Sequence, residues 1–119
     1  MDENIIKVWK EDFAIVKSKQ FNKNAFANIN DVNEISIIID ETKINVEDVI
    51  EIDKGWKLIT FEIKLDFGLI GFISKISSAL AEADISIFVI SSYSTDHFLI
   101  KKEKLDKTLE ILKKLEVEI

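Results

Sequence analysis

The spacing of apolar residues predicts strands and helices most clearly in the second half of the chain. Residues 56–64 alternate between apolar and polar positions, a pattern typical of a half-buried strand. After a loop over residues 65–70, apolar side chains recur every three or four positions from about Gly71 to Ala83, which predicts an amphipathic helix. We expect Asp84 to end this helix, because aspartate tolerates the left-handed backbone better than most residues.

The segments that follow predict a hairpin and a second helix. Residues 85–91 are rich in β-branched side chains and are expected to form a strand buried on both faces. A turn over 91–96 and extended residues at 97–100 complete the hairpin, and leucines at 105, 109 and 112 predict the second helix. Leu115, Val117 and Ile119 then alternate as a closing strand. The order is β-α-β-β-α-β, which makes the fold class α+β with a ferredoxin-like arrangement.

The first half has weaker signals. Strands are expected at residues 13–16 and 34–39, with further candidates at 5–9 and 49–52. Asparagines are frequent over 18–33, which predicts a loop with at most one short helical turn around residues 24–28. The segment NEISIII at 33–39 resembles ADISIFV at 83–89, so the two halves are either degenerate repeats or similar by chance.

Composition and charge narrow the possible functions. The 119 residues are 47% hydrophobic and 32% charged and include no proline, which is the composition of a folded domain. The chain has no cysteine, so we expect no disulfide or thiolate metal site and a cytoplasmic location. All 16 basic residues are lysines, and the net charge of −6 argues against binding to nucleic acid or a membrane. We expect neither secretion nor membrane insertion, because no apolar run in the sequence is typical of a leader or of a membrane span.

The stretch GFISKISSALAEADISIFVISSYSTDHFLI, at residues 71–100, resembles an ACT domain. The pieces DFGLIG, LAEADISIF and SSYSTDHFLI are similar to the branch of ACT proteins that includes the CASTOR-type arginine sensors and small two-ACT bacterial proteins. EISIIID and the pair Gly55-Trp56 also fit that branch. The resemblance implies an ACT domain at 55–119, a reduced and degenerate ACT-like half at 1–54, and no catalysis. It also implies a regulatory sensor that binds an amino acid in a crevice between units. We expect no metal and no cofactor.

The same resemblance implies where the ligand would bind. It places contacts at Asp66 and Gly68 before the first helix, at Ser86 and Ile87 in the following strand, and at Asp96 in the hairpin turn. Independently, the backbone N–H groups of a helix beginning near Gly71 would form an anion site for the ligand carboxylate. For each of these residues the alternative is an ordinary turn or strand position. His97 is expected to be a surface strand residue and not part of a catalytic or metal site, because its neighbour Asp96 points to the opposite face.

The sequence bears on three classes of function. A small-molecule sensor fits the ACT pattern, and an acylphosphatase-like hydrolase is disfavoured because the chain has no arginine to hold phosphate. A structural or interaction module that pairs through edge strands and binds no ligand remains the alternative. Short isoleucine-rich edges and the small size of each half also predict a homodimer.

Overall fold

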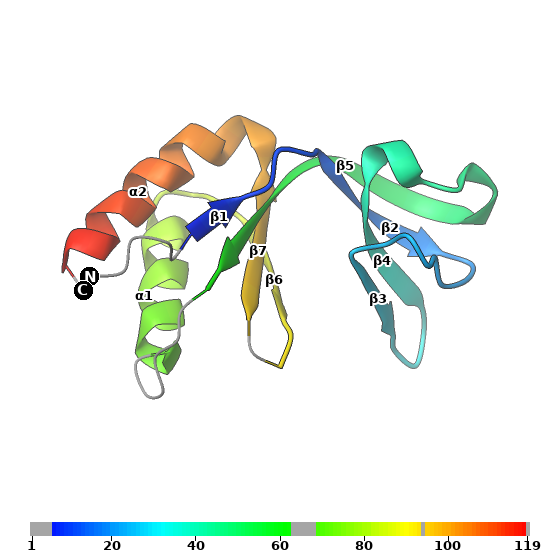
Figure 1. The fold of residues 1–119 in the computed structure, drawn as a ribbon, viewed down its shortest axis with the longest axis horizontal. Helices are drawn as coiled ribbons and strands as arrows, with labels where there is room; N and C mark the ends of the chain where they lie inside the picture. The colour runs from blue at the N-terminus through cyan, green and yellow to red at the C-terminus, as the bar shows by residue number, and fades with distance from the viewer. Residues whose placement is uncertain (1–5, 63–68, 94, 119) are drawn as a thin grey trace. The chain divides into compact units, whose positions relative to one another are not determined.

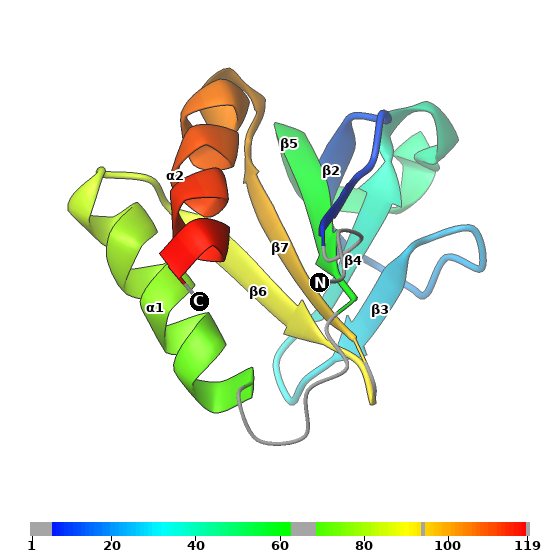
Figure 2. The same cartoon turned by 60° about the vertical axis from the view of Figure 1, so that its left-hand side comes forward.

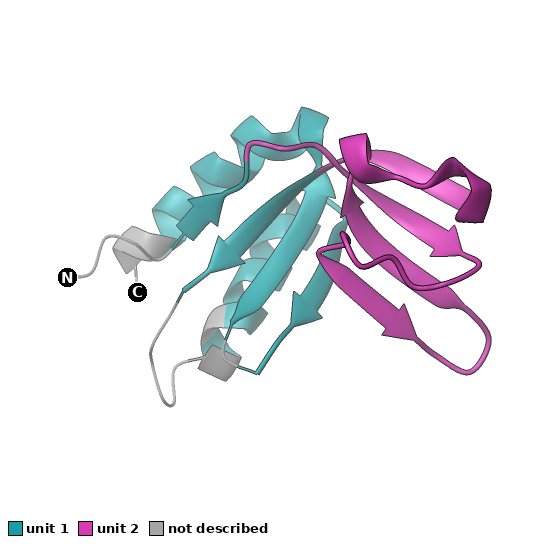
Figure 3. Cartoon of the chain, turned by 45° about the vertical axis from the view of Figure 1, so that its right-hand side comes forward, with its two compact units in different colours: residues 1–9, 57–119 teal, residues 10–56 magenta. Residues whose placement is uncertain are grey.

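Residues 6–62, 69–93 and 95–118 are described by the computed structural model. The chain divides into two compact units, coloured separately in Figure 3. Unit 1 contains residues 1–9 and 57–119, and unit 2 contains residues 10–56. The long strand β5 (Val49–Phe61) contributes to both units. The division into halves at residues 54 and 55 expected above stays a prediction.

Unit 1 is an antiparallel sheet with two helices on one face. Its strands are β1 (Ile6–Val8), the second part of β5, β7 (Asp96–Lys101) and β6 (Ile87–Ser91), in the order β1-β5-β7-β6. The helices α1 (Leu69–Glu82) and α2 (Leu105–Glu118) pack on the same face of the sheet (Figures 1 and 2). A short 3₁₀ turn, η3 (Lys102–Lys104), leads into α2.

The core of unit 1 lies between this sheet and the helices. Phe61 and Phe98 meet edge to face with their ring centroids 4.9 Å apart, an arrangement that aromatic pairs prefer. Around them lie further fully or nearly fully buried side chains from the strands and both helices: Ile59, Ile76, Leu80, Ile85, Ile100 and Leu112. Burial of each such large side chain contributes about 1.5–3 kcal/mol. The helical stripe predicted over residues 71–83 is therefore confirmed as a core face.

The end of α1 is fixed by a residue in the left-handed region. Asp84 has a φ of 65°, as its sequence position predicted. The N–H of Asp84 donates to the carbonyl of Ala81 at 3.0 Å, and the N–H of Ile85 donates to the carbonyl of Leu80 at 2.9 Å. These two bonds form a Schellman motif, and the accompanying hydrophobic contact is present because Ile85 and Leu80 share one core cluster.

Three predictions for unit 1 are wrong. The closing strand at Leu115, Val117 and Ile119 is absent from the described residues, because α2 continues to Glu118 and Leu115 packs on the core as a helix residue; Ile119 lies outside the described residues. The edge position beside β5 is occupied by β1, with Ile6 opposite Phe61. The strand β6 is not buried on both faces, since it forms an edge and Val89 is 44% exposed. Conversely, β5 is not half-buried at 58–61, where both faces are covered.

Unit 2 is a sheet without α-helices in its described residues. Its strand order is β3 (Ala27–Asn30), β4 (Ile35–Asp40), β2 (Phe13–Ser18) and the first part of β5. Two 3₁₀ turns, η1 (Glu41–Lys43) and η2 (Val46–Asp48), join β4 to β5. A small cluster of Ala14, Val16, Ile37 and Ile39 forms its core.

The asparagine-rich segment contains a strand that the sequence did not predict. Residues 27–30 form β3 where a loop with a helical turn was expected. The side chain of Asn28 accepts a hydrogen bond from the N–H of Asn22 at 2.9 Å and donates to its carbonyl at 3.0 Å. A side-chain amide thus substitutes for a backbone partner and holds the preceding loop beside the strand.

Candidate functional site

The predicted ligand-binding residues all belong to unit 1. Asp66 and Gly68 lie outside the described residues. Gly71 is exposed in the first turn of α1, and Ser86 is exposed just before β6. Ile87 is the half-buried first residue of β6, and Asp96 is the buried first residue of β7.

Within unit 1 these residues lie at two different ends of the sheet. Asp96 pairs with Ser91 at one end of the β6–β7 hairpin, whereas Ile87 pairs with Ile100 at the other. The two pairs are four positions apart along the strand, or about 13 Å at roughly 3.3 Å per residue. The helix α1 begins at the hairpin-turn end (Figure 2). Gly71 and Asp96 are therefore at the same end of unit 1, and Ser86 and Ile87 are at the opposite end.

Asp96 is a buried carboxylate on the helix-covered face of the sheet. Its residue is 8% exposed, and the hydroxyl of Ser91 donates to its Oδ1. Phe98, two residues further along the strand, belongs to the core beneath the helices, so Asp96 points to the same face. A carboxylate in this position could accept hydrogen bonds from an ammonium group.

His97 points to the other face and joins a chain of polar contacts. It is 8% exposed, so the prediction that it lies on the surface is wrong. The Nδ1 of His97 lies 2.9 Å from the Oγ1 of Thr60, which also accepts a hydrogen bond from the indole N–H of Trp9 at 2.9 Å. The ammonium of Lys7 lies 4.1 Å from the centroid of the Trp9 ring, within range of a cation–π interaction. These contacts connect β1, β5 and β7 side chains over long separations in sequence.

The imidazole of His97 is buried beside polar partners. An indole N–H can only donate, so Thr60 accepts from Trp9, and its hydroxyl can either donate to Nδ1 of His97 or accept from it. Burial lowers the pKa of His97 below its ordinary value, and the neighbouring Asp96 carboxylate partly opposes that shift. The described residues contain no group of three or more histidine, cysteine, aspartate and glutamate side chains placed to hold a metal ion.

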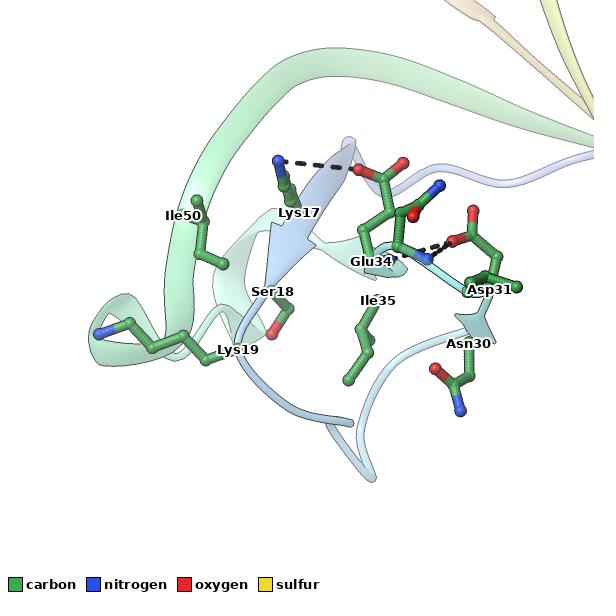
Figure 4. Close-up of a pocket in the computed structure, with 10 residues that line it drawn as sticks. Lys17, Ser18, Lys19, Asn30, Asp31, Glu34, Ile35 and Ile50 are labelled. Carbon is green, nitrogen blue, oxygen red and sulfur yellow. Dashed lines mark hydrogen bonds and ion pairs between the residues drawn. The ribbon is translucent and has the colours of Figure 1, made fainter.

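Unit 2 carries a separate concave surface, shown in Figure 4, which we call the unit 2 hollow. It has a volume of about 310 Å³ and lies where β2 and β4 meet the start of β5. Its lining includes Lys17, Ser18, Glu34, Ile35 and Ile50, together with the turn between β3 and β4. Sequence reasoning missed it, because the residues come from three separate segments and no motif marks them.

Comparison with known proteins identifies a family for this chain and solved structures with a similar fold. A family model described as ACT domain matches residues 51–114. No curated protein matches the chain. Neither described helix has the length and apolar character needed to cross a bilayer.

Several solved structures share the fold. A protein from Agrobacterium tumefaciens is 24% identical with a TM-score of 0.80, and the match covers 92% of this chain and 86% of that one. A Vibrio cholerae protein of unknown function, titled a possible transport protein, is 19% identical with a TM-score of 0.75, covering 92% and 88% of the two chains. The aspartate kinase of Clostridium acetobutylicum, titled an allosteric enzyme, is 14% identical with a TM-score of 0.68. That match covers 92% of this chain but 34% of the kinase. At these identities the likeness establishes the fold.

Proposed function

Because the chain belongs to the ACT domain family, we propose that it is a non-catalytic regulatory module that binds a free amino acid in the cytoplasm. A structure titled a C-terminal regulatory domain of aspartate kinase shares its fold, and this supports a regulatory role. We place the chain in the branch with the CASTOR-type sensors and the small two-ACT proteins, with residues 1–54 as a degenerate ACT-like half and 55–119 as the ACT domain.

The observation that carries this proposal is the buried carboxylate of Asp96. It lies at the end of unit 1 where α1 begins, with one oxygen held by Ser91. An α-amino acid needs an acceptor for its ammonium and donors for its carboxylate, and a helix N-terminus supplies backbone donors together with a partial positive charge. Asp66 or Asp96 would hold the ammonium, while the backbone N–H groups at the start of the helix near Gly71 would hold the carboxylate, with Gly68 and Gly71 allowing the ligand to approach the backbone closely.

Ser86 and Ile87 would belong to the ligand site of a neighbouring copy of the chain. They lie at the far end of β6 from Asp96, so they complete the site only if it is formed by two units from neighbouring copies. The proposal therefore includes a homodimer in which these residues approach the α1 end of the partner chain.

A thermal-shift panel of the twenty amino acids tests this function. A ligand present at 100 times its Kd and bound only by the folded chain adds about 2.7 kcal/mol to stability. We expect at least one amino acid to raise the melting temperature, with the response confirmed by calorimetry. If no amino acid changes the melting temperature, the function is wrong and the module that pairs through edge strands without a ligand becomes the better explanation.

A further inference from the structure

Two loop segments of unit 2 enclose a second hollow, which we call the loop hollow. It lies between residues 20–24, which follow β2, and residues 43–48, which precede β5, and it has a volume of about 450 Å³. We infer that it binds a mononucleotide, a planar base that carries a phosphate monoester. The inference is independent of the proposed function, because the predicted amino acid site lies in unit 1.

The two walls of the loop hollow are joined through Asp48. The side-chain amide of Gln20 donates to both carboxylate oxygens of Asp48, at 3.1 and 3.0 Å, and the amide of Asn45 donates to Oδ2 at 3.0 Å. The backbone N–H of Lys19 donates to the carbonyl of Asp48 at 2.8 Å. Because these bonds hold both segments without a ligand, binding requires little ordering of the chain.

The loop hollow has two lysines without an ion-pair partner among the described residues. Lys23 and Lys43 line it, one from each wall, and Lys43 also stabilises the Asp40 carboxylate at longer range. The acidic side chain in the lining, Asp48, is already bonded to two side-chain amides. Two ammonium groups match a phosphate monoester, which carries about −1.5 to −2 charges at pH 7. Lysine binds phosphate as a point charge, so this binding needs no arginine.

Phe21 supplies a flat apolar surface beside these charges. It lines the loop hollow and is 55% exposed. Its neighbours are fixed, Gln20 by Asp48 and Asn22 by the side chain of Asn28, which accepts from the N–H of Asn22 at 2.9 Å and donates to its carbonyl at 3.0 Å. The backbone on both sides of the ring is therefore held in place. Every base has a face that can stack on an aromatic side chain, so a base on Phe21 would place its phosphate among the lysines.

The size of the loop hollow and its remaining polar groups also suit a nucleotide. Its volume of about 450 Å³ falls within the range of roughly 300–1,000 Å³ for small-molecule sites. The side-chain amide of Asn24 lines it without a hydrogen bond to another described residue. Such an amide can both donate and accept, as the polar edge of a base requires.

Isothermal titration calorimetry on the full chain with AMP, GMP, CMP and UMP tests the inference. We expect at least one of them to bind, with a Kd that rises as sodium chloride is added, because salt screens exposed charges. The corresponding nucleoside lacks the phosphate, and ribose 5-phosphate lacks the base. Each should bind at least about 10-fold more weakly than the nucleotide.

Matched variants locate the binding site. Lys23→Met and Lys43→Met should each raise the Kd about 10-fold, and Phe21→Leu should raise it about 5-fold. Lys113→Met, at an exposed position of α2, and Tyr93→Leu, at a fully exposed aromatic residue, are the controls and should leave the Kd nearly unchanged. Circular dichroism melting curves check that every variant is folded.

Three results would overturn the inference. The first is that none of the four mononucleotides binds. The second is binding that the Lys23, Lys43 and Phe21 variants change no more than the controls do. The third is equal or tighter binding of ribose 5-phosphate, or of a short single-stranded RNA without a terminal phosphate, since a simple anion site or a nucleic-acid site would then explain the data. None of these results bears on the proposed function, which the amino acid panel tests separately.

Discussion

The hydroxyl of Thr60 lies between the indole N–H of Trp9 and the Nδ1 of His97, at 2.9 Å from each. This single oxygen joins β5 to the segment after β1 and to β7, at separations of 51 and 37 residues in sequence. Burial lowers the pKa of the imidazole that Thr60 contacts, and this links the stability of unit 1 to pH.

We predict that the free energy of unfolding falls as the pH drops below about 6.5, the ordinary pKa of histidine. Burial lowers the pKa of His97 in the folded chain, so the unfolded chain takes up the proton first and is favoured. Each unit of difference between the two pKa values is equivalent to about 1.4 kcal/mol. Chemical denaturation measured between pH 4.5 and 8 checks this.

His97→Asn is the control for that experiment, because a side-chain amide can still form a hydrogen bond with Thr60 but does not titrate. This variant should lose the pH dependence between 5 and 6.5. Asp40, whose pKa is lowered by hydrogen bonds from Thr42, affects stability in a separate and more acidic range. An unchanged profile in His97→Asn would contradict the role of the imidazole.

Asp96→Asn should weaken binding of any amino acid that the chain recognises at the predicted site. The amide keeps an acceptor for the Ser91 hydroxyl but loses the charge that would hold the ligand ammonium, which corresponds to at least a 10-fold rise in Kd for a lost charge-assisted hydrogen bond. Calorimetry of the variant beside Glu110→Gln, an exposed acidic position of α2, measures the effect. Equal affinities in the two variants would remove Asp96 from the site.

Asp84→Gly should stabilise the chain by about 0.5–1 kcal/mol. Left-handed backbone costs a non-glycine residue roughly 1–2 kcal/mol, and the added chain entropy of glycine when unfolded offsets about half of that gain. Ala81→Gly, three residues earlier in α1, should instead destabilise by about 0.5–1 kcal/mol, because glycine there lies within the helix. Denaturant midpoints of the two variants should shift in opposite directions, and a shared direction would count against this account of the helix end.

Thr108→Val should also be stabilising, by about 1 kcal/mol. The Thr108 side chain is 1% exposed, and its hydroxyl has no hydrogen-bond partner among the described residues. An unsatisfied buried hydroxyl costs about 1–3 kcal/mol, and valine has the same shape without the polar group. Thr60→Val is the contrasting variant and should destabilise, since the Thr60 hydroxyl has two partners. Thermal melts that rank the two variants in the reverse order would contradict this interpretation.

Val89→Lys should dissociate the proposed homodimer. The strand β6 is an uncharged edge of unit 1, and Val89 is 44% exposed on it. A lysine on an edge strand opposes pairing between chains. Light scattering should give half the native mass for this variant and the native mass for Val46→Lys, a control on η2 that is 79% exposed. A monomeric native chain would refute the dimer itself.

The sequence predicted the parts of the fold that depend on local spacing. Both helices were identified from apolar residues three and four apart, and Asp84 was identified as the end of α1. The closing strand was wrong because Leu115 continues the spacing of α2 as well as it begins an alternation. The length of β5 was missed because Glu51, Asp53 and Lys54 interrupt its apolar pattern, although pairing with β2 keeps them in the strand.

The polar contacts of His97 and of Lys17 could not be predicted from the sequence. His97 looked exposed because no nearby residue indicates a partner, and its partner Thr60 is 37 positions away. The unit 2 hollow was missed for the same reason, because Lys17 and Glu34 are distant in sequence and are brought together by the pairing of β2 with β4. Contacts of this kind are set by strand register, which local patterns leave open.

The position of β1 beside β5 also affects how the protein is made. On the ribosome, Ile6–Val8 emerges before its partners Ile59 to Phe61, which are synthesised more than fifty residues later. Unit 2 lies wholly between these two segments in sequence. It can therefore fold while β1 is still unpaired. Unit 1 is therefore completed only after residues 57–119 have been synthesised.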